Sequence, residues 1–454
     1  MSKKKKNYSD ETIVAIATPQ GTGSISIIRL SGTDALTIGE KIVGRALKPR
    51  YAHSCKFISF KGDLIDKGLA IFFPNPQSFT GEDVVELHCH GGIIISDMLL
   101  NTAYHYGARG ANPGEFSLRA FLNDKIDLTQ AEAIADLISS SSAEAARSAL
   151  RSLEGVFSDK INTIQNQLTK LRVHIEAFLD FPEEEIDPKE QAELDKEFYI
   201  VYENMSSLVK ESKQGVILNT GINIVIAGPT NAGKSSLLNR LAGYSTAIVT
   251  DIPGTTRDTL KEKITIDGLA INVTDTAGIR ETTDPVEQEG ISRAGQAIEA
   301  SDCLIWVCDI SSDIDQNIKD AKQLAEGKKT ILVLNKIDLI NKPAKLFELD
   351  NLTGVQLSVL TGEGMGVFLK QLISISGYSP NSGGTFSARS RHIESLEKSK
   401  GILSAAMHNF KEKKALELAA EDLRMVQRAL SEITGELTSD DLLGEIFSSF
   451  CIGK

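Results

Sequence analysis

The chain has 454 residues, of which 41% are hydrophobic and 24% are charged. A chain of this length usually forms more than one hydrophobic core, so we expect two or three domains, and the composition excludes a mainly disordered protein. No apolar run approaches the ~18 residues of a membrane helix, and none is long enough for a signal peptide. Five cysteines without a CxxC pair favour a reducing cytoplasm. The net charge of −12 disfavours tight, sequence-independent nucleic-acid binding but is compatible with a local RNA contact.

The pattern of apolar residues changes along the chain. Residues 1–124 combine short β-rich runs with glycine- and proline-rich turns, which predicts a compact α+β domain. Residues 125–220 and 380–454 repeat apolar residues at helical intervals, whereas 221–379 alternates strand and helix patterns. Because amphipathic helices must cover their apolar stripes, we expect one split helical domain with an α/β domain inserted into it, in a multidomain α/β protein.

The first helical stretch predicts two long helices. Their apolar stripes cover 153–178 and 194–208, and the second helix is expected to stop at Gly215. The connection at 183–197 holds eight acidic residues against two lysines, which is typical of a solvated surface.

A phosphate-binding loop is predicted in the inserted domain. Residues 222–241, INIVIAGPTNAGKSSLLNRL, read as a buried strand, a G-x-x-x-x-G-K-S loop and a helix. Gly228 and Gly233 let backbone N–H groups turn toward phosphates, Lys234 places its charge on β and γ oxygens, and Ser235 can ligate Mg²⁺. The alternative, a glycine-rich turn with a surface lysine, does not explain the strand before and the helix after.

Three further boxes indicate a guanine nucleotide. DTAG ends a strand, where Asp275 can hold Mg²⁺ through water and Gly278 can meet the γ-phosphate. NKID ends another strand, and the Asp338 carboxylate can accept N1–H and the 2-amino group of guanine, which adenine lacks. The segment 358–360 can add a backbone N–H to the guanine carbonyl. The sequence therefore predicts binding and hydrolysis of GTP.

The segment 250–258, TDIPGTTRD, suits a switch loop, with Thr256 as a second Mg²⁺ hydroxyl. Ile279 stands where Ras-like proteins carry the glutamine that orients the attacking water. Glu287 is our candidate for that role, with a surface glutamate on a switch helix as the alternative. Asn231 offers a side-chain oxygen that can hold a monovalent cation near the β/γ bridge.

The catalytic candidates are thus Glu287, Lys234 and Asn231. The residues predicted to contact the nucleotide are Asn231, Ala232, Gly233, Lys234, Ser235, Ser236, Thr250, Asp251, Ile252, Pro253, Gly254, Thr255, Thr256, Asp275, Thr276, Ala277, Gly278, Asn335, Lys336, Ile337, Asp338, Ser358, Val359 and Leu360.

These boxes and their flanks resemble one family over essentially the whole chain. The motifs GPTNAGKSSLLN, TDIPGTTRD, DTAGIR, NKID, TGEDVVELHCHGG, PGEFSLRAFLNDKIDLTQAEAIADLI and FCIGK look like those of the tRNA-modification GTPases of the MnmE (TrmE) family. The resemblance implies an N-terminal domain similar to folate-dependent aminomethyltransferases, a split helical bundle and an inserted Ras-like P-loop G domain. It also implies a homodimer through the N-terminal domains, with G domains that meet during hydrolysis.

The resemblance further implies work with the flavoprotein MnmG, as a heterotetramer, on C5 of the wobble uridine of tRNA, with 5-formyl-tetrahydrofolate as one-carbon source. Glu287 would be the catalytic glutamate, and Cys451 either a functional thiol of unassigned role or a packing residue. The implied cofactor sites are Ser235 and Thr256 for Mg²⁺, Asn231, Thr250, Ile252 and Thr255 for K⁺, and Arg29, Glu86, Lys125 and Lys454 for folate.

Some of these residues also have purely structural interpretations, and one alternative function is open. Arg29 and Glu86 alone would suggest a cross-strand ion pair, and His88-Cys89-His90 makes a poor chelate because neighbours on a strand face opposite ways. The alternative function is a GTP-dependent RNA or ribosome assembly factor of the Era type. A basic RNA-binding module attached to the G domain would favour that alternative, and none is evident.

Overall fold

The structure is a computed structural model of the whole chain. It describes residues 11–19, 21–180, 187–244, 261–275, 298–325, 327–379, 386–411, 415–437 and 439–453. The chain forms two compact units, one of Met1–Ala135 with Gln427–Lys454 and one of Asp136–Val426. No helix of the described ranges is both long and apolar enough to cross a membrane.

The first unit is built on a six-stranded sheet in the order β3-β4-β5-β2-β1-β6, antiparallel except for β1 with β6. Helices α1 and α2 pack against the sheet, so an α+β arrangement is confirmed. The elements are β1 Ile13–Ile16, β2 Ser26–Ser31, α1 Ala35–Val43, β3 His53–Ile58, β4 Leu64–Phe73, β5 Val84–Cys89, α2 Ile93–His105, β6 Arg109–Gly110, α3 Glu115–Leu122, and α14 Asp440–Ser448.

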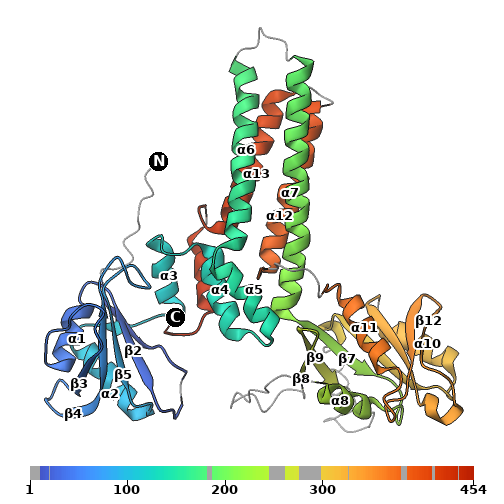
Figure 1. Cartoon of the computed structure of the whole chain (residues 1–454), viewed down its shortest axis with the longest axis horizontal. Helices are drawn as coiled ribbons and strands as arrows, with labels where there is room; N and C mark the ends of the chain where they lie inside the picture. The colour runs from blue at the N-terminus through green and yellow to red at the C-terminus, as the bar shows by residue number, and fades with distance from the viewer. Residues whose placement is uncertain are drawn as a thin grey trace. The chain divides into compact units, whose positions relative to one another are not determined.

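The second unit contains long helices that pack side by side. α6 lies along α7, and α12 packs on α7 (Figure 1). Phe198 of α7 lies 5.3 Å from Phe410 of α12 between ring centroids, and Phe157 of α6 stacks at 4.4 Å on Phe386, in the segment before α12. The helices are α5 Ala143–Leu153, α6 Val156–Asp180, α7 Pro188–Thr220 and α12 Ser390–Lys411, while α4 Leu128–Ser139 and α13 Leu416–Thr434 each cross a boundary of the units.

Two helix limits differ from the prediction. Leu153 ends α5 and does not belong to α6, because Gly155 with a φ of +94° breaks the helix between them. Gly215 does not stop α7, which continues to Thr220 and ends at Gly221. A Cβ atom at position 215 would lie 2.2 Å from the Phe386 carbonyl oxygen, so this glycine serves close packing inside the helix.

The inserted part of this unit is a seven-stranded sheet in the order β12-β13-β11-β10-β7-β9-β8, parallel except at its two antiparallel edges. Both faces are covered, since alternate residues of β10 enter two different hydrophobic clusters. The elements are β7 Ile222–Ala227, α8 Lys234–Gly243, β8 Lys261–Ile266, β9 Leu269–Asp275, β10 Cys303–Asp309, α10 Ile314–Ala325, β11 Lys329–Asn335, η2 Ile337–Ile340, β12 Lys345–Leu349, β13 Leu352–Gln356 and α11 Met365–Ser376.

Candidate functional site

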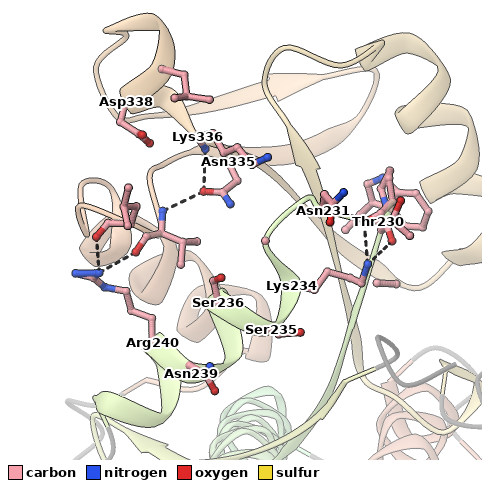
Figure 2. A pocket seen from close by; sticks show the side chains of 18 of the residues that line it. Thr230, Asn231, Lys234, Ser235, Ser236, Asn239, Arg240, Asn335, Lys336 and Asp338 are labelled. Carbon is pink, nitrogen blue, oxygen red and sulfur yellow. Dashed lines mark hydrogen bonds between the residues drawn. The ribbon is translucent and has the colours of Figure 1, made fainter. Parts of the chain in front are cut away.

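A pocket lies beyond the carboxyl ends of the parallel strands β7, β10, β11 and β13 (Figure 2). Each of these strands ends at this edge of the sheet. The loops after β7, β11 and β13 line the pocket, and β10 contributes Trp306. Ligands bind at this edge in open α/β sheets, because side chains and loop N–H groups from several strands converge there.

The loop between β7 and α8 turns tightly. Gly228 has a φ of +138°, and a Cβ atom on it would lie 2.0 Å from the Val307 carbonyl oxygen. Gly233 has a φ of +101°, and its Cβ would lie 2.3 Å from Asn335 Nδ2. Asn231 between them is left-handed, with a φ of 62°. The two glycines of the motif are therefore required both by backbone conformation and by the close approach of neighbouring strands.

Lys234 begins α8 and folds back over this loop. Its ammonium nitrogen donates hydrogen bonds of 2.8 Å to the carbonyl oxygens of Gly228 and Pro229. Ser235 is exposed in the first turn of the same helix and lines the pocket. A helix N-terminus with a cation and a hydroxyl beside it suits an anionic phosphate and a hard metal ion with oxygen ligands.

The other end of the pocket is organised by Asn335, the last residue of β11. Its Oδ1 accepts hydrogen bonds from the N–H groups of Lys336 and Val359, at 2.8 and 3.0 Å, and its Nδ2 donates to Ala232 O at 2.8 Å. Nearby, the Asp338 Oδ1 atom is buried and has no hydrogen-bond partner among the described residues. An acceptor left in this way fits a ligand that brings its own N–H donors, as guanine does.

Lys336 pairs with Asp309, the last residue of β10, at 2.8 Å. Burial raises the pKa of the Asp309 carboxyl, but the hydrogen bonds from Lys336 and Ser311 outweigh it and lower the pKa to about 2. The pair joins the ends of two adjacent strands beside the pocket.

Ten of the predicted nucleotide residues line the pocket together. They are Asn231, Gly233, Lys234, Ser235, Ser236, Asn335, Lys336, Asp338, Val359 and Leu360. The side chains of Ala232, Ile337 and Ser358 are buried. The predicted residues that lie outside the described ranges are Thr250, Asp251, Ile252, Pro253, Gly254, Thr255, Thr256, Thr276, Ala277, Gly278, Glu287 and Lys454, and the side chain of Asp275 is not described either.

The candidate folate residues occur in the first unit. Arg29 of β2 and Glu86 of β5 are register partners, and Arg29 Nε lies 2.9 Å from Glu86 Oε1. Burial raises the pKa of Glu86, but the His88 hydrogen bond and the Arg29 charge together hold the pKa below its ordinary value. The Arg29 guanidinium also lies 5.8 Å from the Phe79 ring centroid. The cross-strand ion pair is thus real, with an aromatic ring beside it.

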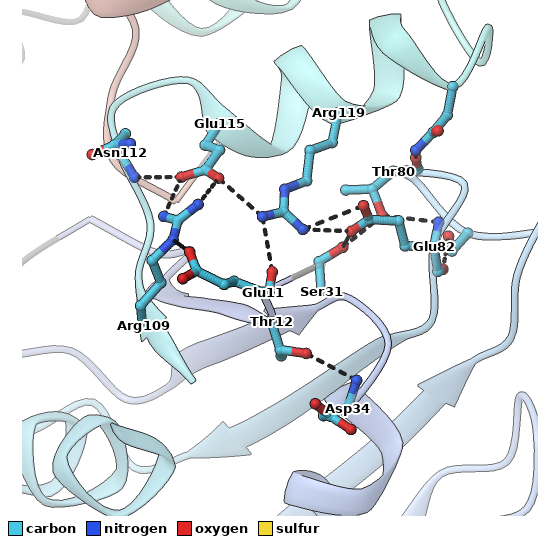
Figure 3. A network of polar contacts seen from close by, with 12 residues as sticks. Glu11, Thr12, Ser31, Asp34, Thr80, Glu82, Arg109, Asn112, Glu115 and Arg119 are labelled. Carbon is cyan, nitrogen blue, oxygen red and sulfur yellow. Dashed lines mark hydrogen bonds and ion pairs between the residues drawn. The ribbon is translucent and has the colours of Figure 1, made fainter. Parts of the chain in front are cut away.

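The segment that carries Phe79 is held by an ion-pair network (Figure 3). Arg119 of α3 binds Glu82 at 2.9 Å and Glu115 at 3.0 Å, and Arg119 and Glu115 are each 4% exposed. Lys125, after α3, donates to the Pro76 carbonyl oxygen at 2.9 Å. The network therefore ties this segment to α3, and the Lys125 contact ties it to the residues that follow.

Two other expectations concern histidine and cysteine. His90 binds Asp66 at 2.8 Å while His88 binds Glu86, and no cluster of three or more metal-ligating His, Cys, Asp or Glu residues occurs in the described ranges. The two histidines therefore bind different carboxylates. Cys451 is exposed and has a free thiol, and its backbone carbonyl oxygen accepts a 3.3 Å hydrogen bond from the Gly114 N–H.

Sequence reasoning missed three side chains that line the pocket or support it. Arg240 binds two carbonyl oxygens of the 358–360 segment, Asp309 pairs with Lys336, and Trp306 lines the pocket wall. The partners of Arg240 and Asp309 belong to other elements of the fold, so no local motif marks these two residues.

The comparisons with known proteins agree with this architecture. The model of the MnmE helical domain matches residues 128–451, and that of the GTP-binding protein TrmE N-terminus matches residues 12–125. The tRNA modification GTPase MnmE of Hydrogenovibrio crunogenus is 49% identical over 449 residues, which is 98% of this chain and 99% of that protein. The protein of the same name from Nitrosomonas europaea is 47% identical over 449 residues, 98% of this chain and 100% of that protein.

Among solved structures, the G domain of the T. maritima FeoB iron transporter is 24% identical, with a TM-score of 0.26, and covers 34% of this chain and 98% of that one. A GTP-binding protein of Sulfolobus solfataricus in complex with GDP is 20% identical, with a TM-score of 0.27, over 47% of this chain and 67% of that one. The family assignment rests instead on the full-length relatives and on the two family models. By that evidence, this chain belongs to the MnmE family of tRNA modification GTPases.

Proposed function

We propose that the chain binds and hydrolyses GTP in the pocket described above and, with MnmG, modifies C5 of the wobble uridine of tRNA. The observation that carries the nucleotide assignment is the buried Asp338 Oδ1, which has no hydrogen-bond partner among the residues that the structure describes. An N1–H and a 2-amino group would satisfy it, whereas adenine would leave it unpaired, at a cost of about 1–3 kcal/mol.

The phosphate end has groups for each charge on the nucleotide. Lys234 would exchange its two carbonyl partners for β and γ oxygens, and loop N–H groups would surround them. Ser235, with Thr256, would hold Mg²⁺, and Asn231 with Thr250, Ile252 and Thr255 would hold K⁺. Bound cations neutralise the negative charge that develops on the phosphates during hydrolysis. Glu287 would orient the attacking water.

The first unit would bind a reduced folate such as 5-formyl-tetrahydrofolate. Arg29, Glu86, Lys125 and Lys454 are the proposed contacts. Support comes from the half-buried Arg29–Glu86 pair beside the Phe79 ring, since a pterin presents both hydrogen-bonding edges and a flat face. The folate would supply the one-carbon unit of an aminomethyl-type group, and Cys451 is a candidate functional thiol near this unit's α3.

We further propose a homodimer through the N-terminal domains and a heterotetramer with MnmG. GTP hydrolysis would then drive a conformational cycle in which G domains meet. The proposed domains are residues 1–124, 125–220 with 380–454, and 221–379. The full-length likeness to proteins named for tRNA modification favours this function over an Era-type assembly factor.

The direct test is nucleoside analysis of tRNA from cells that lack the gene, complemented by wild type or by Asp338→Ala. We expect unmodified wobble uridines without the gene, recovery with wild type and no recovery with the variant. Unchanged wobble uridines in the deletion strain would defeat the proposed tRNA function, and ribosome-subunit profiles of the same strain would then test the assembly-factor alternative.

A further inference from the structure

The segment expected to meet the guanine carbonyl, residues 358–360, is bound by two side chains from other elements of the fold. Asn335 Oδ1 accepts the Val359 N–H, and Arg240 of α8 donates through Nη1 to Val359 O at 2.7 Å and to Leu360 O at 3.0 Å. Figure 2 shows the Arg240 side chain reaching from the helix to this segment. Arg240 therefore joins the phosphate-binding helix to the guanine end of the pocket.

One N–H group of this segment remains available. The Val359 N–H is already bound to Asn335, whereas the Leu360 N–H donates to no acceptor in the described part of the chain. Leu360 lines the pocket and the residue is 81% exposed. The Leu360 N–H is thus the donor best placed to bind the carbonyl of a guanine base.

The contact with Arg240 decides where that donor points. Val359 C=O and Leu360 N–H belong to one peptide unit, which is planar and trans, so the two groups point in opposite directions. A guanidinium that holds the oxygen on one side therefore aims the N–H to the other side. The charge also polarises the peptide, because hydrogen bonds in a chain strengthen one another.

The absence of a side chain at Gly362 leaves room for the Arg240 guanidinium. A Cβ atom on Gly362, whose φ is +87°, would lie 2.5 Å from Arg240 Nη2. A side chain at this position would therefore push the guanidinium away from the two carbonyl oxygens.

From these contacts we infer that Arg240 is a positioning residue for guanine recognition, which aims and strengthens the Leu360 N–H toward the base carbonyl. This inference rests on the proposed binding of guanine nucleotides. Arg240 would thus act, through the Leu360 N–H, on recognition of the carbonyl of the six-membered ring, while Asp338 would accept the N1–H and the 2-amino group.

The test measures nucleotide affinity and dissociation for GDP, IDP and 6-thio-GDP in the full chain. Arg240→Met keeps the apolar stem and removes the charge, and Lys319→Met, on the exposed face of α10, is the matched control. We expect Arg240→Met to weaken GDP and IDP equally, by about 10-fold and through faster dissociation, because both carry the carbonyl. The loss for 6-thio-GDP should be below about 3-fold, since a thiocarbonyl accepts hydrogen bonds poorly.

In GTP hydrolysis, Arg240→Met should raise KM with little change in kcat, and Arg240→Lys should recover part of the affinity. Gly362→Ala provides a second variant that keeps the arginine but crowds it, and it should show the same nucleotide pattern. Equal losses for GDP and 6-thio-GDP, or no loss at all, would overturn the inference. Failure of wild type to bind GDP would instead defeat the proposed function.

Discussion

The side-chain amide of Asn335 donates a 2.8 Å hydrogen bond to the carbonyl oxygen of Ala232, 103 residues earlier in the chain. The oxygen of the same amide accepts the N–H groups of Lys336 and Val359. One side chain thus joins the phosphate loop to both segments at the guanine end. A glycine at 233 is necessary for this contact, because a Cβ there would lie 2.3 Å from the amide nitrogen.

Guanine selection should be reversible by one substitution at Asp338. Asp338→Asn presents an amide N–H₂ to the 2-amino group of guanine, so two donors face each other, whereas the 2-carbonyl of xanthine can accept. We expect GDP affinity to fall by about 100-fold and XDP affinity to rise, given about 1–3 kcal/mol for each unpaired buried group. Titration of both nucleotides measures this, and retained preference for GDP would refute the assignment.

Hydrolysis should require potassium and pairing of G domains. Ile279 stands in place of the usual water-positioning glutamine, a role that Glu287 would take. A cation held at Asn231 would neutralise charge at the β/γ bridge, as an arginine finger does in other GTPases. The rate should be high in KCl, low in NaCl at equal ionic strength, and should rise with protein concentration. Asn231→Ala and Glu287→Ala should each reduce kcat by roughly 10²-fold while GTP still binds. Equal rates in the two salts would sink this mechanism.

Folate should bind through Arg29 without any nucleotide. Calorimetry of the full-length protein with 5-formyl-tetrahydrofolate should show binding that Arg29→Ala weakens by about 10-fold, because a hydrogen bond to a charged group contributes about 1.5–3 kcal/mol. Arg45→Ala, an exposed arginine of the same unit, is the control and should leave the affinity unchanged. Undiminished affinity in Arg29→Ala, or no heat with wild type, would remove this site.

Replacing Gly215 by alanine should destabilise the helical part. Gly→Ala inside a helix normally stabilises by about 0.5–1 kcal/mol, but here the new Cβ would lie 2.2 Å from Phe386 O. We expect a net loss of about 1–3 kcal/mol from overpacking. Gly401→Ala in α12 is the control, since nothing lies within 4 Å of its Cβ position, and it should stabilise. Urea unfolding followed by circular dichroism compares the two, and stabilisation by both would contradict the packing argument.

The Asp309–Lys336 pair should add a pH dependence to stability. Asp309 has a pKa of about 2 in the folded chain against 3.8 for an ordinary aspartate, so its contribution is complete above about pH 4 and is lost as the pH falls toward 2. Asp309→Asn should lower the unfolding free energy at pH 7 by up to about 1 kcal/mol, as for partly exposed pairs. Between pH 4 and pH 2, the urea midpoint of Asp309→Asn should fall less steeply than that of wild type. Equal falls in the two midpoints would count against the pair.

Much of the nucleotide site could be predicted from local patterns. A buried strand, a glycine-spaced loop and a helix follow one another within residues 222–241, and NKID begins at the last residue of the strand β11. Such patterns are readable because backbone conformation and strand or helix period depend on neighbours in the chain. The same patterns placed Asn335 and Lys234 in one pocket, since parallel strands end at a common edge.

Other features were decided only by the tertiary structure. The sequence suggested that Gly215 ends a helix, whereas the structure shows that it allows the close approach of Phe386. No sequence pattern marked Arg240, and only the fold brings it to the Val359 carbonyl oxygen. Asp309 meets Lys336 only because β10 and β11 are adjacent in the sheet. In each case the partner is far along the chain, and its proximity depends on strand order and helix packing, which arise from burial of many apolar side chains together and not from any local run of residues.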